Sequence, residues 1–129
     1  MLAIDQAIAG NGPIVGLLGI SGVFDLRPLL HTSINIDLRM SAEEAVGASP
    51  LLRLTQLRES DRLMPLLGLV GGDETAGFKQ WTAGLVSAWR AQGGKASYKE
   101  ITGCNHFTIL DEVAKADGEV LSVITSFLV

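Results

Sequence analysis

The segment ITGCNHF, residues 101–107, places one of only two histidines in a short loop between two different periodic patterns. Residues 97–101 alternate polar and apolar side chains, which is typical of a strand with one buried face. Residues 107–113 carry apolar side chains three and four positions apart, the spacing of a helix packed on a core. The segment therefore predicts a strand–loop–helix unit that holds His106 at the carboxyl end of a strand, where α/β folds place functional groups.

Two continuous apolar runs, residues 14–21 and 65–71, predict two further strands. The first run is typical of a central parallel strand that is buried on both faces. The second begins at a proline, in a position where a missing N–H costs little. It leads directly into the turn at residues 72–75, which carries two carboxylates.

Helical spacing of apolar residues occurs weakly in residues 2–8, strongly in 78–89 and again in 120–128. A capping box at Ser41–Glu44 predicts the start of a short helix in the connection between the first two strands. Residues 51–64 mix leucines with charged side chains and predict an irregular, partly exposed connection. Strands that alternate with helices predict an α/β fold of about three parallel strands flanked by helices.

Composition and charge exclude several classes of function. The net charge of −4, the pI near 5.0 and the scattered distribution of ten basic residues argue against a nucleic-acid partner. The single cysteine excludes an intrachain disulfide, and the two histidines lack metal-ligand spacing, so we expect no metal and no other cofactor. No apolar run reaches the length of a membrane span and no signal-peptide pattern begins the chain, which predicts a cytoplasmic protein without a membrane partner.

Two predicted strand ends carry polar groups of complementary kind. Asp73 and Glu74 follow the second strand, and His106 follows the third. In a parallel sheet both ends lie at the same edge, so a carboxylate could accept from one ring nitrogen and leave the other to take a proton from a nucleophile. Acid before histidine is the chain order of the α/β-hydrolase triad. The residue types leave open which carboxylate pairs with the ring.

Four segments together resemble a known family: ISGVFDLRPLL at 20–30, the pair Ser49-Pro50, VGGDE at 70–74 followed by Phe78, and GCNHF at 103–107. They resemble the C-terminal half of bacterial arylformamidases (kynurenine formamidases) and related α/β-hydrolase esterases. The resemblance implies a partial α/β-hydrolase fold. It also implies hydrolysis of the N-formyl group of formylkynurenine in tryptophan catabolism, or of a small ester, through an acyl-enzyme.

The same resemblance implies roles for individual residues. His106 would be the catalytic histidine. Glu74 is the preferred acid because the family pattern of a glycine, two residues and an acid matches Gly71 and Glu74, and Asp73 is the alternative. His31 would line the substrate pocket in the family, and a partly exposed loop histidine is an equally simple interpretation of it.

The family's His-Gly-Gly oxyanion segment and Gly-x-Ser-x-Gly nucleophile elbow do not occur in the chain. The nearest match, Gly19–Val23, lacks the final glycine, and we interpret Ser21 as structural. Residues 1–129 are therefore expected to form a single partial α/β-hydrolase domain, the C-terminal half, with the N-terminal half of the sheet missing. The mean hydropathy of +0.33 agrees, because a small domain with so much apolar surface needs something to pack against.

The expected partners are a small formamide or ester substrate and either the missing N-terminal half or a second copy, which would join through the exposed edge of the strand at 14–21. The alternative function, from a different class, is a catalytically inactive truncated α/β fragment that acts through protein association.

Other conspicuous residues have simpler interpretations. Cys104 lies two positions from His106, a spacing at which side chains on a turn rarely meet, so we do not expect a catalytic thiol. Asp25 and Arg27 are expected to hold their loop together, through a local ion pair or through bonds to the backbone, and not to contact substrate. Trp81 and Trp89 follow the apolar stripe of their helix and predict core packing.

Overall fold

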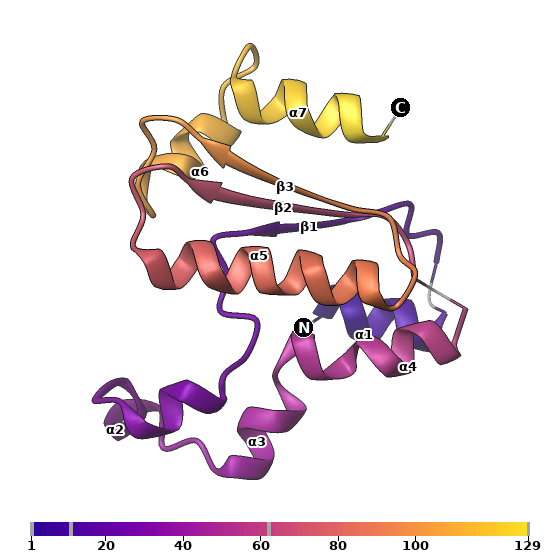
Figure 1. The fold of residues 1–129 in the computed structure, drawn as a ribbon, viewed down its shortest axis with the longest axis vertical. Coiled ribbons are helices and arrows are strands. Elements are labelled where there is room, and N and C mark those ends of the chain that lie inside the picture. Colours follow the sequence, from indigo (N-terminus) through magenta and orange to yellow (C-terminus); the bar gives the residue numbers. More distant parts are fainter. Residues whose placement is uncertain (1, 11, 62, 129) are drawn as a thin grey trace.

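Three parallel strands form one sheet with helices on both faces (Figure 1) in the computed structural model, which describes residues 2–10, 12–61 and 63–128. The strands are β1 (Leu17–Ile20), β2 (Leu66–Gly71) and β3 (Ala96–Ile101), in the order β1-β2-β3. Both pairings are parallel, which confirms the predicted arrangement of three parallel strands flanked by helices.

The first strand differs from its prediction in length and position. Only residues 17–20 of the apolar run 14–21 pair as a strand, and β1 lies at an edge of the described sheet, where Leu18 is 43% exposed. The central strand is β2, whose six residues are all buried. Burial on both faces explains why β2 reads as a continuous apolar run.

Alternate residues of β2 face two separate cores. Leu66 packs with α1 (Leu2–Ala9), α4 (Leu54–Glu59) and α5 (Ala76–Ala91) on one face. Leu67 and Leu69 pack with α6 (Thr108–Val113) and α7 (Glu119–Leu128) on the other. Figure 1 shows these two helical layers on opposite sides of the sheet. No helix in the described ranges is both long and apolar enough to cross a membrane.

The prediction of core packing is confirmed for Trp89, whereas Trp81 is only partly buried and belongs to neither core. Trp89 is fully buried in the first core, where its Nε1–H donates to the Met64 carbonyl oxygen at 3.0 Å. Trp81 is partly buried and meets the ring of Phe78 edge to face, with the centroids 5.6 Å apart.

The connection between β1 and β2 contains η1 (Arg27–His31), α2 (Ile34–Leu38), α3 (Ala42–Gly47) and η2 (Pro50–Arg53). The part of this connection that contains α2 and α3 extends away from the sheet (Figure 1). The predicted capping box at Ser41 is present at the start of α3, and the predicted Asp25–Arg27 ion pair forms at 2.7 Å.

The prediction for residues 51–64 is wrong. This segment contains η2 and α4, and Leu54 and Leu57 of α4 are buried in the first core. The charged side chains that suggested an irregular connection, Arg58 and Glu59, lie on the exposed side of a helix of only six residues. A buried stripe of two leucines is too short to stand out as a helical period.

Leu57→Ala is expected to lower the free energy of unfolding by about 2–5 kcal/mol, because a fully buried leucine leaves a cavity when it is truncated. Leu110→Ala is the matched control, since Leu110 is 60% exposed, and it should change stability by less than about 0.5 kcal/mol. Urea denaturation of the two variants and the wild type measures the difference. Equal effects of the two substitutions would contradict the placement of α4 in the core.

Candidate functional site

The site lies where the three parallel strands end. Ser21 directly follows β1, Glu74 lies three residues after β2, and His106 lies five residues after β3. Because the carboxyl ends of parallel strands meet at one edge of the sheet, side chains far apart in the sequence come together there.

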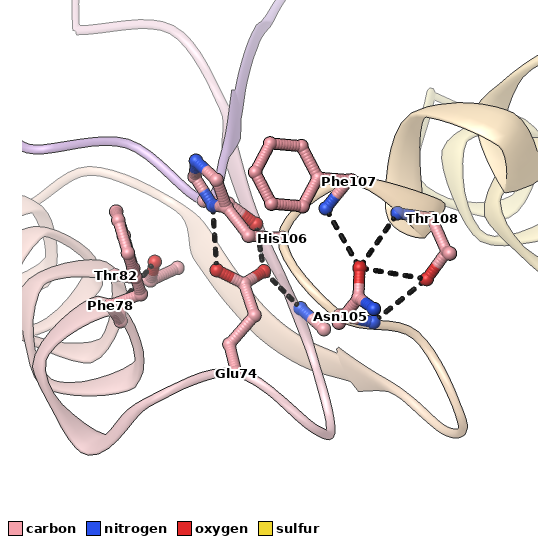
Figure 2. Close-up of polar contacts among 9 residues, drawn as sticks. Glu74, Phe78, Thr82, Asn105, His106, Phe107 and Thr108 are labelled. Atoms are coloured by element: carbon pink, nitrogen blue, oxygen red, sulfur yellow. Dashed lines mark hydrogen bonds and ion pairs between the residues drawn. The ribbon is translucent and has the colours of Figure 1, made fainter.

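Glu74 and His106 form the central contact of the site. The Nδ1 atom of His106 lies 2.9 Å from Oε2 of Glu74. The Glu74 side chain is fully buried, whereas 42% of the His106 side chain is exposed. Figure 2 shows the imidazole beside the carboxylate, with α5 on one side and the start of α6 on the other.

Asp73 occupies a different environment. Its side chain is exposed, and its backbone N–H donates to the Cys104 carbonyl oxygen at 2.9 Å. The structure thus places Glu74 beside the imidazole, and Glu74 is the acid that the family resemblance favoured. Asp73 has no described contact with His106.

The second oxygen of the Glu74 carboxylate is held by two donors. Oε1 accepts from the Ser21 hydroxyl and from the Gly71 backbone N–H, the latter at 2.8 Å. Burial by itself raises the pKa of Glu74, but the hydrogen bonds from Ser21 and Gly71 and the contact with His106 outweigh it, so the pKa is lowered.

An ionised carboxylate can only accept hydrogen bonds, so Glu74 selects the tautomer of His106 that carries a proton on Nδ1. In the neutral ring, Nε2 then bears the free lone pair. The pair is therefore arranged to accept a proton at Nε2 and to stabilise the imidazolium that results.

Close packing of two backbone loops fixes the position of Glu74. A Cβ atom on Gly71 would lie 2.3 Å from the Cys104 carbonyl oxygen, so only glycine fits there. The Gly72 N–H donates to the Ile101 carbonyl oxygen at 2.8 Å, and the Lys79 ammonium donates to the Gly72 carbonyl oxygen at 2.6 Å. The first bond joins the turn after β2 to the end of β3, and the second joins the same turn to α5.

The loop that carries His106 is held by its neighbours. The Asn105 side-chain oxygen accepts from the backbone N–H groups of Phe107 and Thr108 at 2.9 and 3.0 Å, which holds the turn that leads into α6 (Figure 2). The ring of Phe78 stacks on the imidazole with centroids 4.2 Å apart and an interplanar angle of 25°. The ring therefore has a fixed orientation although it is partly exposed.

The other sequence candidates lie elsewhere. His31 is exposed at the end of η1 and has no described contact with Glu74 or His106. Cys104 is buried with the second core, as expected of a small apolar residue. Within the described ranges, no group of three or more His, Cys, Asp or Glu side chains could hold a metal ion.

Ser21 is the site residue that the sequence analysis missed. It was interpreted as structural, yet its hydroxyl contacts the carboxylate of Glu74. The available signal was its place at the end of a strand beside β2, which puts it at the same sheet edge as Glu74 and His106.

Two curated relatives match the chain over most of its length. A kynurenine formamidase of Danio rerio is 29% identical over 100 residues, which cover 78% of this chain and 34% of that protein. A kynurenine formamidase of Salmo salar is 27% identical over 105 residues, which cover 81% of this chain and 36% of that protein. The chain is similar to part of a kynurenine formamidase.

This similarity supports the formamidase relationship that the sequence motifs predicted, and the chain spans about a third of the length of the curated relatives it matches. No protein-family model matches it. Both relatives are fish proteins, so the resemblance to bacterial members of the family stays a prediction. Membership of the α/β-hydrolase superfamily also stays a prediction.

The stability conferred by Glu74 is expected to depend on pH. Its pKa is lowered from the ordinary 4.5 in the folded chain, so its contribution is present above that value and is lost as the pH falls through the folded-state pKa. The difference in free energy of unfolding between the wild type and Glu74→Gln should therefore shrink as the pH is lowered from 7 to 3.

Urea denaturation at several pH values measures this difference, and Asp73→Asn is the matched control because the Asp73 side chain is exposed. A difference between the wild type and Glu74→Gln that stays constant from pH 7 to 3 would show that Glu74 is not held as an ion.

Proposed function

We propose that the chain supplies the acid and the histidine of a serine hydrolase of the α/β-hydrolase superfamily, acting on N-formylkynurenine or a related formamide or ester. Residues 1–129 would form the C-terminal part of a single catalytic domain. The observation that carries the proposal is the buried Glu74 carboxylate bonded to Nδ1 of a partly exposed His106. The similarity to two kynurenine formamidases supports the choice of substrate.

In the proposed reaction, a serine hydroxyl from polypeptide outside residues 1–129 attacks the formyl carbon, and His106 takes its proton at Nε2. The Glu74 carboxylate stabilises the imidazolium. His106 then gives the proton to the departing aromatic amine, which leaves a formyl ester on the serine. Water, deprotonated by His106, attacks that ester and releases formate and the free serine.

The backbone donors that stabilise the oxyanion would come from the same outside polypeptide. We propose that it joins at the free edge of β1, where Leu18 is 43% exposed and Val15, two residues before the strand, is 74% exposed. Apolar hollows lie on both sides of this edge, one lined by residues that include Phe24 and Trp89 and the other by residues that include Leu67 and Phe127. A further strand would satisfy the free backbone groups of β1 and cover both hollows.

Turnover of N-formylkynurenine and p-nitrophenyl acetate tests the proposal, using the chain mixed with an N-terminal formamidase polypeptide that carries a Gly-x-Ser-x-Gly elbow. His106→Ala should abolish turnover, and Glu74→Gln should lower kcat by about 10²- to 10⁴-fold because the ring loses its tautomer and orientation. Asp73→Asn is the matched control and should leave kcat unchanged. Absence of turnover in the mixture, or a loss with Asp73→Asn as large as with Glu74→Gln, would refute the proposal.

The exposed β1 edge also favours a second candidate function, a non-catalytic fragment that associates through this edge. Under that alternative, the chain forms dimers or larger species whose size decreases with Leu18→Lys, since a charge on an edge strand opposes pairing. Size-exclusion chromatography with light scattering measures this. A monomer for the wild type would exclude self-association as the function.

A further inference from the structure

Ser21 has an unusual backbone conformation for a residue with a side chain. Its φ is +46°, in the left-handed region that disfavours residues other than glycine and asparagine. The residue is 6% exposed, and its N–H donates to the Leu69 carbonyl oxygen at 2.9 Å, which continues the pairing of β1 with β2. A serine at such a position requires a compensating interaction, and its hydroxyl makes one with Oε1 of Glu74.

The contact identifies what Ser21 does not do. A nucleophilic serine donates its proton to Nε2 of the histidine. Ser21 donates to the carboxylate oxygen that faces away from the ring, while Oε2 accepts from Nδ1. Ser21 and the reacting nitrogen therefore lie at opposite ends of the carboxylate–imidazole pair.

We propose that Ser21 is a positioning residue which, with the Gly71 N–H, holds Oε1 of Glu74 so that Oε2 is directed at Nδ1 of His106. This inference rests on the proposed function for its catalytic meaning, although the contact itself belongs to the chain alone. A glutamate side chain has three rotatable bonds, and a single contact at Oε2 leaves the carboxylate free to turn. Two donors on the other oxygen remove that freedom.

The hydroxyl also acts on the charge of the acid. Burial raises the pKa of Glu74, and Ser21 is foremost among the groups that lower it. The neighbouring titratable groups are His106 from the loop after β3, exposed Asp73 in the same turn, and Lys79 of α5, which bonds the Gly72 carbonyl oxygen. Loss of the Ser21 hydroxyl should therefore raise the pKa of Glu74. The carboxylate would also lose one of the two donors that hold Oε1, so its Oε2 should be less well aligned with Nδ1.

The first test uses NMR on the 129-residue chain, which needs no substrate. Ser21→Ala keeps a side chain at positive φ, whereas Ser21→Gly relieves the backbone, and both remove the hydroxyl. In both variants the pKa of Glu74, measured from the titration of its carboxyl signal, should be higher than in the wild type. The His106 Nδ1–H signal should move upfield. His31→Gln identifies the signals, because the chain has only two histidines. Ser87→Ala, on the exposed side of α5, is the matched control and should change neither signal.

Two outcomes would overturn the inference. Unchanged Glu74 and His106 signals in both folded variants would show that the hydroxyl does not position the acid. A change in Ser21→Ala that is absent in Ser21→Gly would show that backbone strain, and not the hydroxyl, determines the geometry.

The second test uses the assembled hydrolase. Ser21→Ala and Ser21→Gly should lower kcat by about 10- to 100-fold with KM unchanged, as expected for loss of a hydrogen bond to a charged group that acts through the histidine. Changed NMR signals without turnover in the wild-type mixture would refute the proposed function and leave the positioning role standing. Wild-type turnover with full kcat in both variants would refute the positioning role alone.

Discussion

A buried carboxylate is stable as an ion only where enough hydrogen-bond donors surround it, and the end of the sheet is built to meet this requirement for Glu74. The carboxylate receives the Ser21 hydroxyl and the Gly71 N–H on one oxygen and the His106 ring on the other. These donors come from three segments of the chain that are distant in sequence. The site can therefore form only when all three strands are paired in register.

The architecture of the sheet serves this convergence. Parallel pairing brings the strand ends to one edge, and β2 lies in the centre, so the acid has a neighbouring strand on each side. Gly71 allows the turn after β2 to approach the loop after β3 more closely than any residue with a Cβ could. Packing and chemistry are thus coupled, because the backbone contact that joins the loops also sets the distance between acid and imidazole.

The sequence was sufficient for the parts of this arrangement that depend on periodicity. The continuous apolar run of β2 and the alternation in β3 predicted two of the three strands, and their order predicted that the carboxylates and His106 would share an edge. The choice between Asp73 and Glu74 depends on the turn. The Asp73 N–H binds the Cys104 carbonyl oxygen while its side chain lies in solvent, a detail that no residue pattern contains.

The sequence did not predict features that depend on a very short apolar pattern or on the backbone conformation of a single residue. The six residues of α4 bury two leucines, fewer than a recognisable helical period requires. The positive φ of Ser21 is unusual for serine, and its role follows from contacts across the sheet. Ser21 directly follows β1, and β1 lies at an edge of the described sheet. A polypeptide that pairs with this edge would therefore lie next to the strand that positions Ser21 against Glu74. Ser21 is therefore the residue through which pairing at the edge of the sheet would reach Glu74 and, through it, the imidazole.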